Sequence, residues 1–131
     1  MQDGFLTIVT TVDGTESRIS RKAEMDIAPL SAVLRYQDEA ATVSIFVAGD
    51  EVRYERYGDY SLALSLKEGA QTQGTISVAG ADGELRVITH RLGYNIGKGS
   101  LLLKLHYTLD FGEEKQDMRL RINAKIYSEE K

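Results

Sequence analysis

Arg56 is the residue of this sequence whose type and position most suggest ligand binding. In residues 51–57, Val52 and Tyr54 alternate with charged neighbours, and strict alternation places Arg56 on their side of a strand. A guanidinium on the inner face of a sheet needs a partner, and a carboxylate or phosphate would bind it through charge-assisted hydrogen bonds. Phenol groups on predicted apolar faces could hydrogen-bond the same ligand. They belong to Tyr36, Tyr54, Tyr60 and Tyr107.

A structural explanation of Arg56 stays open beside this one. The residue lies near the end of its predicted strand, just before Gly58 and Asp59. From there its side chain could reach the rim of the fold, or pair with a carboxylate or a carbonyl of the chain itself. Charged side chains that are buried without a partner are rare, which favours such pairing.

His90 and His106 are the only histidines, and both fall on the more polar face of their strands. A metal site needs three or four converging ligands, so the sequence predicts two surface histidines and no metal. Neither histidine has a carboxylate at a position that suggests an orienting role, which argues against a Ser-His-Asp triad. No other reaction is suggested, and we expect neither an enzyme nor a cofactor.

Residues 93–100 (Gly-Tyr-Asn-Ile-Gly-Lys-Gly-Ser) superficially resemble a phosphate-binding loop. The spacing of the glycines does not fit that motif, and a strand rather than a helix follows. We therefore predict a flexible connection at one end of the fold.

The longest regular pattern is in residues 101–111. Every odd position is apolar or aromatic, whereas the even positions are mostly polar. Such alternation predicts a strand with one dry face and one wet face. Residues 118–126 have the same pattern and are expected to pair with it.

Similar strands follow one another along the whole chain, and most are separated by two to five residues, as at Asp13-Gly14, Gly49-Asp50 and Gly58-Asp59. Short turns make neighbouring strands antiparallel. The fold class is therefore all-β, a single up-and-down barrel of about eight to ten strands. A two-sheet sandwich is the alternative, although it would usually have longer crossing connections.

Composition limits the kind of protein. The 131 residues predict one domain, 1–131, and the lack of cysteine excludes disulfides and thiolate chemistry. A net charge of −4, with both signs interspersed, argues against nucleic acid as a partner. No apolar run is long enough for a membrane span, and residues 1–4 do not resemble the start of a signal peptide, so the cytoplasm is expected.

Several short motifs together resemble a known family. They are residues 36–39 (Tyr-Gln-Asp-Glu), 49–52 (Gly-Asp-Glu-Val), 56–58 (Arg-Tyr-Gly), 68–69 (Glu-Gly), 83–89 (Gly-Glu-Leu-Arg-Val-Ile-Thr) and 101–109. This pattern is similar to the YwiB-like family of small bacterial proteins, a domain of unknown function. The resemblance implies a calycin-type barrel, like those of lipocalins and fatty-acid-binding proteins, and supports ligand binding by analogy.

Two functions remain as hypotheses. The first is a barrel that binds a small amphipathic or anionic ligand in its interior through Arg56 and the four tyrosines. The second is a solid-cored barrel that acts through its outer surface as a protein-interaction or oligomerisation module, with Phe46, Tyr57 and Leu102 as a candidate patch. A homodimer is compatible with both.

Overall fold

The computed structural model describes residues 1–127, and within them the chain forms ten β-strands and no helix. The strands are β1 (Gln2–Val12), β2 (Thr15–Ile27), β3 (Ser31–Asp38), β4 (Ala41–Ala48), β5 (Glu51–Tyr57), β6 (Tyr60–Lys67), β7 (Gln71–Val78), β8 (Ala81–Gly97), β9 (Ser100–Asp110) and β10 (Lys115–Ile126).

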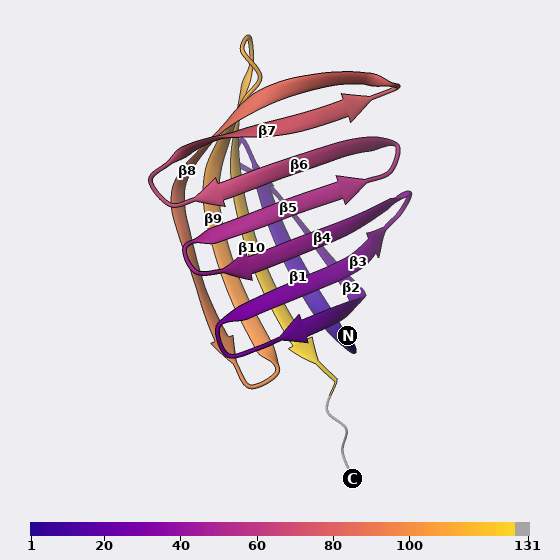
Figure 1. The fold of residues 1–131 in the computed structure, drawn as a ribbon. Coiled ribbons are helices and arrows are strands. Elements are labelled where there is room, and N and C mark those ends of the chain that lie inside the picture. The colour runs from indigo at the N-terminus through magenta and orange to yellow at the C-terminus, as the bar shows by residue number, and fades with distance from the viewer. Residues whose placement is uncertain (128–131) are drawn as a thin grey trace.

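The ten strands form a closed antiparallel barrel. Each strand pairs with the next along the chain, and β10 pairs with β1 to close the ring. The predicted all-β up-and-down barrel is therefore confirmed, with ten strands. In Figure 1, β8, β9 and β10 run steeply while β3 to β7 cross them at a large angle. The barrel thus resembles two crossed sheets with the core between them.

The alternating pattern decides which side chains fill that core. On β9 the odd positions Leu101, Leu103, Leu105, Tyr107 and Leu109 are all buried. β9 pairs with β10 from Ser100↔Lys125 to Asp110↔Lys115, as expected for these two segments. Their buried residues join those of the crossing strands, including Leu34, Ile45 and Leu66, in one cluster.

The predicted loop at residues 93–100 is wrong. β8 continues through Gly97 and pairs with β9 as far as Gly97↔Ser100, so only Lys98 and Gly99 form the turn. Gly99 has a φ of +73°, which suits a tight hairpin. The glycine-rich segment is therefore the end of an extended strand followed by a two-residue turn.

A β-bulge interrupts β8 between Thr89 and Arg91. Before it, Leu85, Val87 and Thr89 are buried, whereas after it Leu92, Tyr94 and Ile96 pack against the core. The extra residue shifts the phase of the alternation by one. Arg91 consequently lies on the outer face, where strict alternation from Thr89 would have turned it inward.

The end of β9 also differs from the prediction, because the strand stops at Asp110 and not at residue 111. The Asp110 carboxylate is 5% exposed, accepts a hydrogen bond from the backbone N–H of Gly112 at 2.9 Å and pairs with Arg86 at 3.1 Å. It thereby fixes the turn, and Phe111 is left 38% exposed outside the core.

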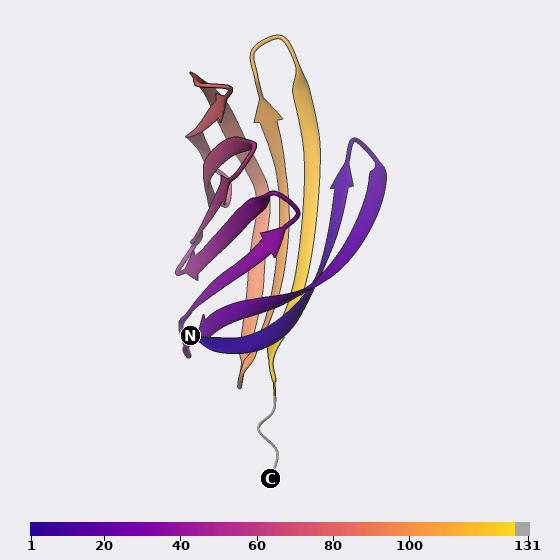
Figure 2. The same ribbon diagram turned by 90° about the vertical axis from the view of Figure 1, so that its right-hand side faces the viewer.

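Although the ring of strands is closed, its wall splays apart between β2 and β3. β2 pairs with β3 only through Ala23–Ile27, so the first half of β2 has no strand on that side. Figure 2 shows the consequence: the β1–β2 hairpin, in indigo, rises away from the tips of the β3–β4, β5–β6 and β7–β8 hairpins. We call this opening the mouth of the barrel.

Two of these hairpin tips pack closely at Gly58, which gives a testable prediction. A Cβ at Gly58 would lie 2.6 Å from the Ala40 carbonyl oxygen and 2.7 Å from the Ala41 Cβ. Gly58→Ala should lower the free energy of unfolding by about 1–3 kcal/mol, measured by urea denaturation. The control is Gly83→Ala, where the nearest atom is 3.6 Å away and no loss is expected. Equal losses in both variants would contradict the close packing.

Candidate functional site

Three of the four predicted tyrosines meet inside the barrel near the mouth. Tyr36 on β3 and Tyr107 on β9 are buried, and Tyr54 on β5 is partly buried against the same core. Burial, reinforced by the neighbouring phenols, raises the pKa of Tyr36 and Tyr107 far above the usual value, and that of Tyr54 to about 12. All three are therefore neutral phenols at physiological pH, able to donate a hydrogen bond.

Arg56 lies on the inner face, as the alternation predicts, because it is opposite Val43 and Leu62 in the register. Its side chain is 13% exposed and turns to the rim, where it pairs with Asp59 at 2.9 Å. It also donates to the backbone carbonyl of Tyr60 at 2.7 Å. The sequence left two alternatives for Arg56, an inward orientation and pairing with a group of the chain itself. In the structure both occur together.

Tyr60 completes the predicted set at the rim itself. Its ring lies under the Arg56 guanidinium, whose central carbon is 3.8 Å from the ring centroid. The side chain is exposed at the first position of β6. Cation–π contact and the Asp59 carboxylate therefore hold the guanidinium in place.

A second ion pair, not predicted from the sequence, lies at the mouth. Arg21 on β2 pairs with Asp38 on β3 at 3.2 Å, and both side chains are partly buried. Asp38 and Arg21 are close enough to Tyr36 to influence its pKa, so this pair adjoins the three phenols. The available signal was Arg21 itself, which interrupts the apolar face shared by Ile19 and Ala23.

Thr89 adds a further polar group to the interior. It faces Tyr107 across the β8–β9 pairing. Its hydroxyl is buried and has no hydrogen-bond partner in the described part of the chain. A buried hydroxyl without a partner is destabilising, so this position requires an explanation.

These residues define the mouth site, which consists of Arg21, Tyr36, Asp38, Tyr54, Arg56, Asp59, Tyr60, Thr89 and Tyr107. It combines neutral phenol and hydroxyl groups inside with two Arg–Asp pairs at the rim. Such an arrangement can bind a polar or anionic group and place it next to apolar surface. It contains no nucleophile paired with a base.

The histidines are closer to other groups than the sequence predicted. His106 Nε2 lies 2.8 Å from the Asp117 carboxylate, so the expectation that neither histidine has such a partner is wrong. His90 Nε2 lies 2.8 Å from the Thr108 hydroxyl, and the two imidazole rings are 4.8 Å apart. Within residues 1–127, no group of three or more acidic or histidine side chains is placed to hold a metal ion.

The candidate surface patch is not assembled. Phe46 faces outward on β4, with the Arg53 guanidinium 5.2 Å from its ring. Leu102 lies on β9, between Asn95 and Asn123, in the other crossed sheet. Tyr57 is exposed at the end of β5. These three side chains are therefore separated from one another and do not form one apolar patch.

Comparison with known proteins places the chain in a family. The family model described as "Domain of unknown function (DUF1934)" matches residues 7–122. The chain belongs to the DUF1934 family. Its structure is similar to the crystal structure of the ywiB protein from Bacillus subtilis, with a TM-score of 0.80 over 97% of this chain and 93% of the other, at 15% sequence identity. No curated protein matches the chain significantly.

These comparisons confirm the YwiB-like resemblance of the sequence and the barrel fold that it implies. The family description names no activity, and the fold by itself does not imply one. The described residues contain no helix that is long and apolar enough to cross a membrane.

Proposed function

We propose that this DUF1934 protein is a binding barrel without catalytic activity. Its ligand is a small amphipathic molecule whose polar or anionic head lies among the phenols of the mouth site. Arg21 and Arg56 stand at the rim, each paired with an aspartate, and an anionic head would compete with Asp38 and Asp59 for hydrogen bonds from the two guanidinium groups.

The observation that supports this proposal most is the Thr89 hydroxyl, which is buried opposite Tyr107 without a partner. Buried polar groups are nearly always hydrogen-bonded. The cross-strand neighbour of Thr89, Tyr107, has a neutral phenol, which can donate a hydrogen bond at physiological pH, and Tyr107 in turn is near Tyr54. An oxygen of a bound head group, reaching this point, would satisfy both Thr89 and a phenol.

The rest of the interior limits the size of the ligand. Leu34, Ile45, Leu66, Leu103 and Ile122 are almost completely buried and occupy the centre of the barrel. Protein cores are densely packed, so a long acyl chain would have to displace these side chains. The ligand therefore has a short apolar part that stays near the mouth.

The test uses anilinonaphthalene sulfonate, an aromatic anion whose fluorescence rises in apolar surroundings, and octanoate as its competitor. The intact protein should bind the dye at one site and release it when octanoate is added. Arg56→Met and Tyr107→Phe should each weaken dye binding by about tenfold, because a hydrogen bond to a charged head is lost.

Arg53→Met is the matched control, because Arg53 is on the outer face of the same strand and pairs with Glu55. It should leave the affinity unchanged. A dye that binds the Arg56→Met protein as tightly as the parent, or that octanoate does not displace, would refute binding at the mouth. Thermal denaturation of each variant separates lost binding from lost folding.

A further inference from the structure

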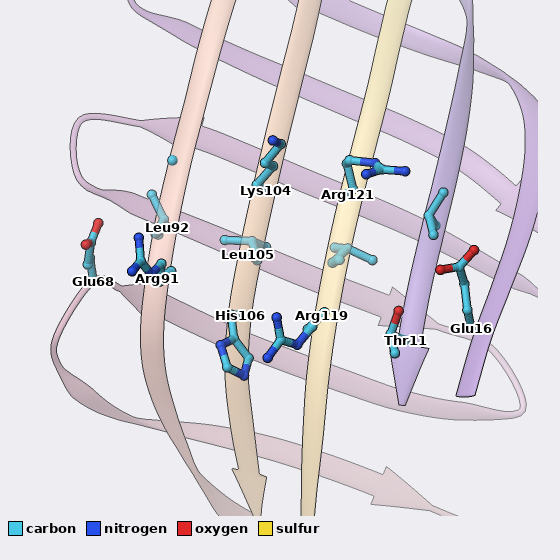
Figure 3. Close-up of a pocket in the computed structure, with 13 residues that line it drawn as sticks. Thr11, Glu16, Glu68, Arg91, Leu92, Lys104, Leu105, His106, Arg119 and Arg121 are labelled. Carbon is cyan, nitrogen blue, oxygen red and sulfur yellow. The ribbon is translucent and has the colours of Figure 1, made fainter. Parts of the chain in front are cut away.

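A second site lies on the opposite face of the wall, outside the barrel. The outer surface of β8, β9, β10 and β1 forms the floor of an open groove of about 480 Å³, whose lining is shown in Figure 3. Its basic side chains define what we call the outer groove: Arg91, Lys104, His106, Arg119 and Arg121. None of them belongs to the mouth site.

The register places these basic side chains side by side. Lys104 on β9 is directly opposite Arg121 on β10. His106 is directly opposite both Arg91 and Arg119. The like charges of Lys104 and Arg121, at directly opposed positions of the sheet, are destabilising. The groove thus concentrates positive charge in a protein whose net charge is −4.

Internal ion pairs neutralise little of that charge. Asp117 interacts with His106 at 2.8 Å and lies 3.8 Å from the Arg119 guanidinium. Within residues 1–127, Arg91, Lys104 and Arg121 take part in no ion pair. Three cations on three neighbouring strands therefore share one groove and form no ion pair with the described chain.

The bulge in β8 is what brings Arg91 into this group. By shifting the alternation after Thr89, it turns Arg91 outward beside His106. The backbone of Thr89 is fixed by the β6–β7 turn, because Gly69 donates to its carbonyl and its own N–H donates to the Ala70 carbonyl. Bulges often redirect a side chain next to a functional site, and this one is held rigidly.

We propose that the outer groove binds a small molecule that carries two phosphate-type anionic groups. The cations span two strand spacings, about 10 Å, and two residues along each strand, about 7 Å. That area fits two anionic groups, one in the row of Lys104 and Arg121 and one in the row of Arg91 and Arg119. One guanidinium group can donate two parallel hydrogen bonds to two oxygens of a phosphate, which suits this ligand class.

The boundaries of the groove limit the ligand to a small molecule. Glu16 on β2 and Glu68 on the β6–β7 turn stand at its two ends, as Figure 3 shows. Between them, Val9 is buried in the floor opposite Arg121. A long polyanion lying across the strands would meet both carboxylates, whereas a compact diphosphate would not.

The experiment is calorimetric titration of the full chain with inorganic pyrophosphate and with orthophosphate, at about 0.15 M salt. Pyrophosphate should bind at one site and saturate at or below about 1 mM, and orthophosphate should bind more weakly. Arg121→Gln should weaken pyrophosphate binding by about tenfold, whereas Glu68→Gln should strengthen it.

Lys125→Gln is the matched control, since Lys125 is exposed on the same face of β10 but outside the groove. Binding should stay within about twofold of the parent in this variant and in Arg56→Met. Absence of saturable binding would overturn the proposal, as would equal losses in Arg121→Gln and Lys125→Gln. Equal affinity for both phosphates would refute the two-group ligand, and a loss in Arg56→Met would place pyrophosphate at the mouth instead.

Discussion

Leu103→Ala should destabilise the protein by about 3 kcal/mol, within the range seen when a buried leucine is truncated. Leu103 is 0% exposed at the centre of β9. It is opposite Ile122, which belongs to the central core, and Tyr94, which packs against that core. The strands around it are closed into a ring, which restricts collapse into the vacated space. Equilibrium denaturation in urea measures the change.

Leu102→Ala is the matched control, because it removes the same atoms one residue away on the opposite face. Leu102 is partly exposed between Asn95 and Asn123. Its truncation should cost less than about 1 kcal/mol. A one-residue shift in strand register exchanges the two faces. Similar losses in both variants, or a larger loss for Leu102, would therefore contradict the register of β9.

The sequence was sufficient for the architecture because its information is local. A side-chain period of two and short turns decide which face of each strand is dry and that neighbours are antiparallel. Residues 101–109 illustrate this, since every odd position predicted to be apolar is buried. Arg56 follows the same rule, and its position near the strand end explains its contact with Asp59.

Features that depend on pairing between distant strands could not be read in the same way. The bulge after Thr89 has no local signature, and it decides the face on which Arg91 lies. The continuation of β8 to Gly97 depends on hydrogen bonds to β9, not on the glycine-rich composition that suggested a loop.

Contacts between side chains depend on register as well. Arg21 meets Asp38 because β2 and β3 align Ala23 with Tyr36, and His106 meets Asp117 across the β9–β10 pair. Alternation identifies the face of each residue but not its neighbour on the next strand. The outer groove was missed for this reason: its cations are dispersed in sequence and converge only in the folded sheet.

The second large effect concerns alkaline pH, where stability should fall steeply. In the unfolded chain, tyrosine loses its proton near pH 10. Inside the barrel, burial raises the pKa of Tyr54 to about 12 and that of Tyr36 and Tyr107 further. Between these limits the unfolded chain binds fewer protons than the folded one, so the free energy of unfolding decreases as the pH rises. The stabilisation is complete below about pH 10 and is lost above it.

Between about pH 9 and pH 11, each of the three tyrosines should lower the free energy of unfolding by about 1 kcal/mol, or by about 3 kcal/mol together. Urea denaturation at the two pH values measures the difference. In a Tyr36→Phe/Tyr107→Phe variant, most of this pH dependence should disappear, because phenylalanine has no proton to lose. Tyr57→Phe is the control, since Tyr57 is exposed at the end of β5, and it should retain the parent's pH dependence. If the double variant also lost stability like the parent, Tyr36 and Tyr107 would not be shielded from water, and the mouth site would lack the dry surroundings in which the proposed ligand places its head.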